Sequence, residues 1–164
     1  SAHVTQTTLY GYIKTRIGSR YAMMFEDEVF LKSINLAKWN IYMAALSDCT
    51  LYVFSYLIDK KNLKHNDALE IFREIIDNEK NNGLEEKLYE SAKLEFDQRL
   101  KEINWKTYHL DTPFKNSGLS LLRWSPIAEN LKALDKKIVL NSIMLKWNLV
   151  ENEFEDLTKN LFFD

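Results

Sequence analysis

The side chains best suited to recognition chemistry lie close together near the start of the chain. Hydroxyl, ammonium and guanidinium groups stand there at every second position, between apolar or small residues. Arginine and lysine donate hydrogen bonds to guanine edges and to phosphates, and tyrosine and threonine hydroxyls can meet a base or a phosphate. The pattern predicts a DNA contact, and the residues expected to make it are Thr8, Tyr10, Tyr12, Lys14, Arg16 and Arg20.

This alternation is typical of a β-strand over residues 7–17, with one face buried and the other exposed. Leu9, Ile13 and Ile17 would point toward the core. Because the chain offers no second strand, we expect this strand to pair with its copy in another subunit, which predicts a homodimer. A basic two-stranded ribbon fits the major groove of B-DNA. The alternative is an exposed edge face whose basic side chains only block aggregation.

The charge distribution is compatible with a DNA-binding start of the chain. The net charge is −2, but residues 1–25 carry three basic residues and no acidic one. The rest of the chain mixes both signs, which usually marks solvated helix faces. The average charge therefore does not exclude double-stranded DNA as a partner.

Residues that commonly hold metals, phosphates or nucleophiles are few and scattered. The glycines form no phosphate-binding loop, a single cysteine excludes an internal disulfide and a cysteine-rich zinc site, and the histidines are far apart. We therefore expect no metal, no cofactor and no catalytic residue. The residues concerned are Gly11, Gly18, Gly83, Gly118, Cys49, His3, His65 and His109.

Two other functions remain open. An enzyme would need one pocket that gathers His109, Asp111 and Arg123, although the first two also suit a polar loop over the core. A helical adaptor that binds a protein and no DNA would present an exposed aromatic patch. The residues expected in that patch are Trp105, Tyr108, Phe114 and Trp124.

The elements that must position these residues are mainly helical, because glycine and proline are rare. Residues 26–58 have helical apolar spacing and contain neither, which predicts one long helix or two. The apolar segment Ile41–Ile58 is long enough to raise the question of a membrane span. Asp48 at its centre favours a buried helix, so we expect a cytoplasmic protein with no membrane contact.

The remainder of the chain predicts further helices. Asn66 can cap a helix that runs to about Lys80 and ends at residues 81–83, and a second helix over residues 84–104 completes a hairpin. Residues 105–118 form an irregular stretch. Ser125 and Pro126 then open a helix, and a final helix closes the core. Their inward residues are expected to be Ile127, Leu131, Leu134, Ile138, Phe154, Leu157 and Leu161.

A basic alternating strand followed by two helices resembles a ribbon-helix-helix unit, which would occupy residues 1–60 ahead of a helical extension over residues 61–164. The whole chain also resembles the AcaB-like transfer regulators of conjugative plasmids and integrative conjugative elements. The segments that carry this resemblance are residues 15–20, 39–58, 110–118 and 133–135. It implies a mainly α, dimeric, cytoplasmic DNA-binding activator of transfer genes, with Tyr12, Lys14 and Arg16 contacting the groove.

Overall fold

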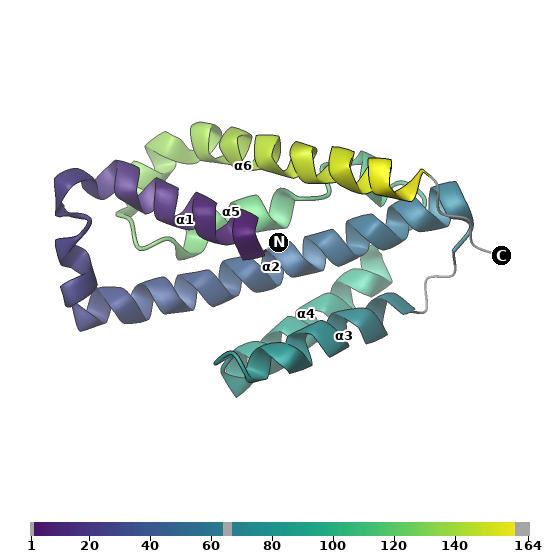
Figure 1. The fold of residues 1–164 in the computed structure, drawn as a ribbon, viewed down its shortest axis with the longest axis horizontal. Coiled ribbons are helices and arrows are strands. Elements are labelled where there is room, and N and C mark those ends of the chain that lie inside the picture. Colours follow the sequence, from purple (N-terminus) through teal and green to yellow (C-terminus); the bar gives the residue numbers. More distant parts are fainter. Residues whose placement is uncertain (1, 64–66, 160–164) are drawn as a thin grey trace.

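The computed structural model describes residues 2–63 and 67–159, and every regular element in these two ranges is helical (Figure 1). The predicted mainly α class is therefore confirmed. Short 3-10 turns, η1 Gly18–Arg20, η2 Met23–Glu26 and η3 Tyr108–Leu110, join some of the helices. The α-helices are α1 Ala2–Ile17, α2 Glu28–Lys61, α3 Asp67–Lys80, α4 Glu86–Glu102, α5 Lys115–Trp124 and α6 Glu129–Thr158.

The centre of the molecule is α2, a single helix of 34 residues. The Asp27 carboxylate caps its start by accepting hydrogen bonds from the amides of Val29 at 2.8 Å and Phe30 at 3.3 Å. Asn62 ends it in the left-handed conformation, with φ of 57°. Because no glycine or proline interrupts it, the segment predicted as one or two helices forms one.

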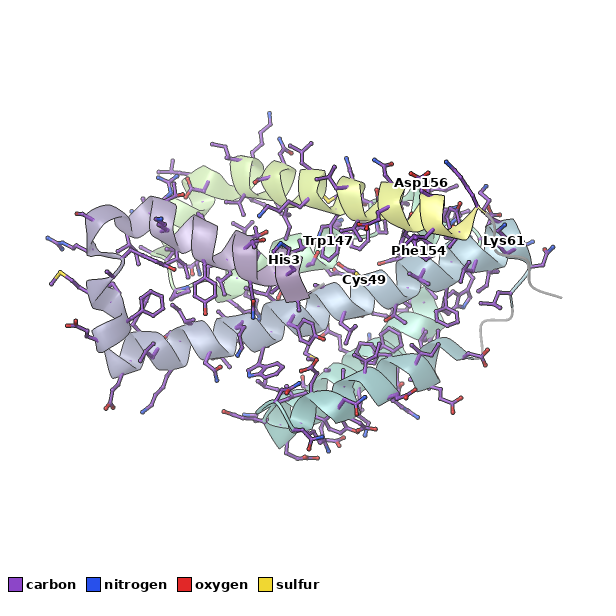
Figure 2. The ribbon with its side chains drawn as sticks, viewed as in Figure 1. His3, Cys49, Lys61, Trp147, Phe154 and Asp156 are labelled. Atoms are coloured by element: carbon purple, nitrogen blue, oxygen red, sulfur yellow. The ribbon has the colours of Figure 1, made fainter. Side chains whose placement is uncertain are left out.

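On one side of α2, the helices α1, α5 and α6 close around a shared core. Trp147 points inward from α6 (Figure 2) and is fully buried, with its ring stacked on Phe114 at a centroid distance of 4.3 Å. Gly118 lets α5 approach α6 closely, since a Cβ there would stand 2.8 Å from Leu140 Cδ2. These contacts make α2, α5 and α6 one packed layer.

On the other side of α2, α3 and α4 form the predicted helical hairpin. Phe72 of α3 and Phe96 of α4 stack at a centroid distance of 3.9 Å and are both fully buried. Gly83 turns the chain with a φ of 92°, which confirms the predicted stop. The expected cap Asn66 lies outside the described residues. Residues 2–63 and 67–159 thus form two apolar cores, one on each side of α2.

The prediction of a β-strand over residues 7–17 is wrong, because these residues belong to α1. The buried side chains of α1 recur at helical spacing, but two of them are threonines, Thr5 and Thr8, which an apolar pattern does not register. Gly11 is exposed, whereas a strand would place it on the same face as Leu9 and Ile13. With no strand in residues 2–63 and 67–159, the ribbon-helix-helix unit and the intersubunit ribbon are overturned.

The predicted inward face of the segment after Pro126 also differs from the structure. Residues 129–158 form one helix, and its buried side chains include Val139, Ile143 and Trp147. Leu134 and Ile138, which we expected in the core, are 77% and 70% exposed. Apolar side chains occupy two faces of α6. The core contains the face with Val139, Ile143 and Trp147, and the predicted face is exposed.

One described helix, α2, is long and apolar enough to cross a membrane, as the sequence suggested. However, 72% of its most apolar window is buried inside the protein by the surrounding helices. This is the arrangement of the core helix in a soluble protein, and it agrees with the expectation of a buried helix around Asp48.

Candidate functional site

The structure places three of the six predicted DNA contacts against α6, although 36% of the Arg16 side chain stays exposed. Tyr12 donates a hydrogen bond to Asp135 Oδ2 at 3.0 Å, and Arg16 forms an ion pair with Oδ1 of the same carboxylate. The Asp135 side chain is 3% exposed. Thr8 is buried and accepts a hydrogen bond from Lys146 Nζ at 3.0 Å. These residues therefore attach α1 to α6.

The other three predicted contacts lie elsewhere. Tyr10 is half-buried, and its ring lies 6.4 Å from that of Phe25. Lys14, on α1, and Arg20, in η1, are exposed to solvent. The six residues do not form one recognition surface within the described chain.

The aromatic patch predicted for an adaptor is not on the surface. Phe114 is fully buried, and Trp105, Tyr108 and Trp124 are half-buried. Three of these rings, those of Phe114, Tyr108 and Trp124, pack on the core formed by α1, α2, α5 and α6. An adaptor built on this chain must bind its partner through other side chains.

His109 belongs to a serine, histidine and aspartate constellation that the sequence did not reveal. Its Nδ1 lies 3.0 Å from Ser55 Oγ, and its Nε2 lies 3.6 Å from Asp59 Oδ2. Such a set could activate a hydroxyl for nucleophilic attack if the hydroxyl were accessible. Ser55 is fully buried, and it donates to the Trp105 carbonyl at 2.8 Å. The constellation thus fastens the loop after α4 to α2.

The electrostatics of His109 agree with this structural role. Burial lowers the pKa of its imidazole, and the nearby Asp59 carboxylate only partly opposes that effect. Asp111 and Arg123, the other residues of the predicted enzyme site, line two adjoining hollows, and His109 lines neither of them. The three residues do not converge on one pocket.

The metal and thiol candidates give no reactive centre among residues 2–63 and 67–159. No three His, Cys, Asp or Glu side chains there lie close enough to hold a metal ion. Burial raises the pKa of the Cys49 thiol to about 12, so the thiol stays protonated and inert.

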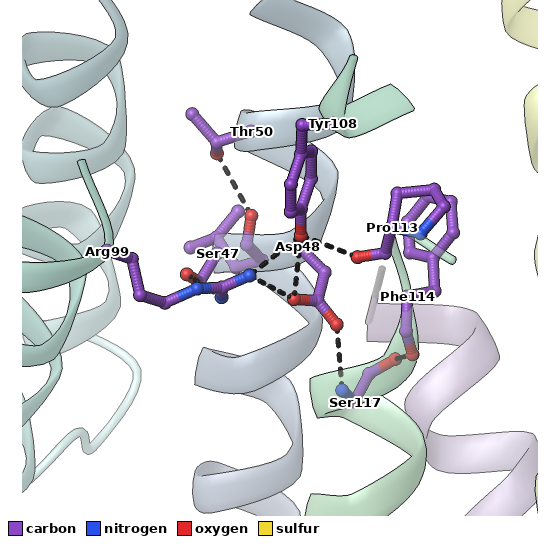
Figure 3. Close-up of polar contacts among 9 residues, drawn as sticks. Ser47, Asp48, Thr50, Arg99, Tyr108, Pro113, Phe114 and Ser117 are labelled. Carbon is purple, nitrogen blue, oxygen red and sulfur yellow. Dashed lines mark hydrogen bonds and ion pairs between the residues drawn. The ribbon is translucent and has the colours of Figure 1, made fainter. Parts of the chain in front are cut away.

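A buried polar cluster surrounds Asp48, at the middle of α2 (Figure 3). Arg99 of α4 donates to Asp48 Oδ1 at 2.6 Å and to Ser47 Oγ. The amide of Ser117, at the start of α5, donates to Asp48 Oδ2 at 2.8 Å. Tyr108 accepts from Arg99 at 2.8 Å and donates to a backbone carbonyl at 2.6 Å. We call Asp48, Arg99, Tyr108 and Ser117 the polar node.

The polar node joins four segments, namely α2, α4, α5 and the loop that contains η3. Burial raises the pKa of Asp48, and Arg99 together with the Ser117 amide opposes that rise. Burial and the adjacent Asp48 carboxylate raise the pKa of Tyr108. Sequence analysis identified Asp48 but not its partner. The signal was available, because an acid inside an apolar helix needs a cation on a neighbouring element.

A groove runs over α2 between α4 and α5, next to the polar node. It consists of two hollows of about 350 and 520 Å³, and both hollows contact Glu95 and Asn116. Arg99 lines the larger hollow, but its side chain is only 14% exposed and its guanidinium already donates to three oxygens. The groove is therefore a depression in which the Arg99 guanidinium is already used to hold the fold together.

The most unusual surface of the described chain is a row of large apolar side chains along α6. These side chains are between 66% and 77% exposed. At 100° per residue they fall within a sector of about 60° on the helix. We call this row the α6 stripe, and its members are Leu134, Ile138, Leu145 and Leu149.

No family model, no curated protein and no solved structure matches this chain.

Proposed function

We propose that this protein is a helical protein–protein interaction module, and that the α6 stripe is its binding surface. The observation that carries this proposal is the exposure of four large aliphatic side chains in one row. Single exposed leucines are ordinary, but four large aliphatic side chains exposed on one face of one helix mark an interaction site. This is the adaptor class that the sequence left open, with the binding surface on α6 in place of the aromatic residues.

The rest of the fold supports a scaffold role. The polar node and the stacked pair Phe114 and Trp147 fix α2, α4, α5 and α6 relative to one another. A rigid helix that presents an apolar row loses little entropy on binding. The hydroxyl nearest to a catalytic arrangement, that of Ser55, is fully buried. These features favour binding over catalysis.

A DNA-binding activator of transfer genes, with a DNA partner, stays a prediction, as does the family resemblance behind it. Of the predicted contacts, Tyr12 and Arg16 bind Asp135 within the chain, and Thr8 is buried. The geometry therefore supports the interaction module better. We assign the module to the cytoplasm, because its only cysteine is a half-buried free thiol and its most apolar helix lies in the core.

Site-specific photo-crosslinking in the cells that make this protein tests the proposed function. A photoreactive amino acid at Leu145, on the α6 stripe, should give a discrete crosslinked product that contains a protein partner. The matched control places it at Lys136, which is exposed on the same helix but about 170° from the middle of the stripe. If Leu145 gives no product beyond that of Lys136, the stripe is not a binding surface and the proposal fails.

A further inference from the structure

The α6 stripe is arranged so that it can pair with a copy of itself. Its members stand at positions 134, 138, 145 and 149, which are symmetric about a point between Asn141 and Ser142. If two α6 helices run antiparallel about that point, Leu134 faces Leu149 of the other copy and Ile138 faces Leu145. Every apolar side chain of the row then has an apolar neighbour, as a two-fold interface requires.

The charges of α6 select the antiparallel orientation. Its first half, residues 129–143, has a net charge of +1, with exposed Lys137 on the flank of the stripe, and its last turns carry Glu151, Glu153 and Glu155. Antiparallel pairing places the basic half of one helix beside the acidic half of the other. Lys137 and Glu151 lie on the same flank of the stripe, and in this register they would be offset along the axis by about 8 Å. Parallel pairing would instead place like charges together.

The position of α6 leaves room for a second copy. In Figure 1, α6 runs along one edge of the molecule, and α1 and α5 lie on its inner side. Val139, Ile143 and Trp147 fill the core from that inner side, whereas the α6 stripe points away from it. The stripe spans about 22 Å of helix, or roughly four turns, which suits helix-to-helix packing along one seam.

We infer that the partner of the α6 stripe is a second copy of this chain, in a two-fold dimer with antiparallel α6 helices. This inference rests on the proposed function and names its partner. It replaces the overturned β-ribbon as the physical basis for a homodimer.

Cysteine crosslinking of the purified protein tests the register. Asn141→Cys places a thiol beside the proposed two-fold axis, and Lys136→Cys places one on the far side of the same helix. The native Cys49 should not compete, because it is half-buried and its pKa is raised to about 12, which keeps the thiol protonated. Oxidation should link Asn141→Cys into a disulfide-bonded dimer and leave Lys136→Cys monomeric on a non-reducing gel. Equal crosslinking of the two variants would overturn the inference.

Analytical ultracentrifugation gives a second measurement that does not depend on a new thiol. The unmodified protein should dimerise with rising concentration, and Leu145→Glu should weaken that dimer roughly a hundredfold, because the symmetry repeats the change in both copies. Leu145 is 66% exposed, so circular dichroism should show an unchanged fold. A monomer at every concentration overturns the inference. The proposed function then survives only if Leu145 photo-crosslinks to a different protein in cells, and it fails if no product forms.

Discussion

Asp48 shows how a single buried carboxylate can organise several elements. Its side chain is fully buried in the longest apolar helix, and its two oxygens accept hydrogen bonds from α4 and α5. A buried charge is costly unless a counter-ion and hydrogen bonds compensate it. The groups that compensate Asp48 come from segments far apart in the sequence, so the charge is satisfied only when those segments are in place.

Arg99→Met should destabilise the protein by about 3–5 kcal/mol, because it leaves Asp48 buried without its cation. The double variant Asp48→Asn/Arg99→Met should recover much of that loss, since the asparagine oxygen can still accept from the Ser117 amide. Urea unfolding monitored by circular dichroism gives both free energies. A double variant no more stable than the single one would show that the buried charge is not the cause.

His109 should make stability depend on pH. Burial lowers its pKa in the folded state, whereas the unfolded chain takes up a proton near the ordinary value of about 6.5. Between these two pKa values the unfolded state binds more protons, so the free energy of unfolding should fall as the pH drops below about 6.5. The loss is complete once the pH is below the folded pKa.

The measurement compares the unmodified protein with His109→Gln at pH 7.5 and at pH 5.5. The unmodified protein should lose more stability on acidification than the variant. Asp48 has a raised pKa, so it acts in the opposite direction, but it is present in both proteins and cancels in the comparison. The same pH dependence in both proteins would assign the effect to another group.

At the level of elements, α1 illustrates a limit of pattern analysis. A spacing of four residues, as from Leu9 to Ile13, satisfies both the strand period and the helix period. Gly11 and Thr15 distinguish the two structures, because a strand would bury them and the helix exposes them. Tertiary packing against α2 and α6 selects the helix, and that packing cannot be predicted from the sequence of α1 alone.

The α3–α4 hairpin was more predictable than α1, and the reason is physical. The α3–α4 hairpin has strong helical periodicity and a glycine stop, so local signals and packing agree. In α6 the local signals were ambiguous, because apolar side chains occupy two faces and only the positions of α1 and α5 decide which face is core. The α6 stripe was missed for that reason, and so was Arg99, whose role depends on a contact between distant segments.

Two glycine substitutions test the helical elements in opposite directions. Gly11 lies in α1, and a Cβ added there would meet no other atom within 4 Å, so Gly11→Ala should stabilise the protein by about 0.5–1 kcal/mol through helix propensity. Denaturant unfolding measures this gain. A loss of stability on this substitution would contradict a helical α1.

Gly118→Leu is the opposite case. A Cβ at this position would stand 2.8 Å from Leu140 Cδ2 and 3.3 Å from Ile143 Cγ2, both on α6. The added side chain should force α5 and α6 apart and cost about 1–3 kcal/mol, despite the better helix propensity of leucine. Thermal unfolding of the two glycine variants under the same conditions checks the contrast. An unchanged midpoint for Gly118→Leu would mean that α5 and α6 are not closely packed.

At the level of the whole molecule, α2 contributes buried side chains to both apolar cores, and Tyr108 of η3 packs against both. One core includes side chains of α1, α5 and α6, and the other those of α3 and α4. Between the cores, direct side-chain links include the polar node, in which Arg99 of α4 reaches Asp48. This organisation indicates two units of local stability on a common helix, and the division near residue 60 stays a prediction.

Phe96→Ala tests that organisation. Removing this fully buried ring from its stack on Phe72 should cost about 3–5 kcal/mol. The loss should appear mainly as local unfolding of the hairpin, because α5 and α6 keep their own core. Native-state hydrogen exchange should therefore show faster exchange in α3 and α4, while the amides of α5 and α6 keep their protection. If α6 loses protection as much as α3, the two cores unfold as one cooperative unit, because α2 transmits the loss from one side to the other.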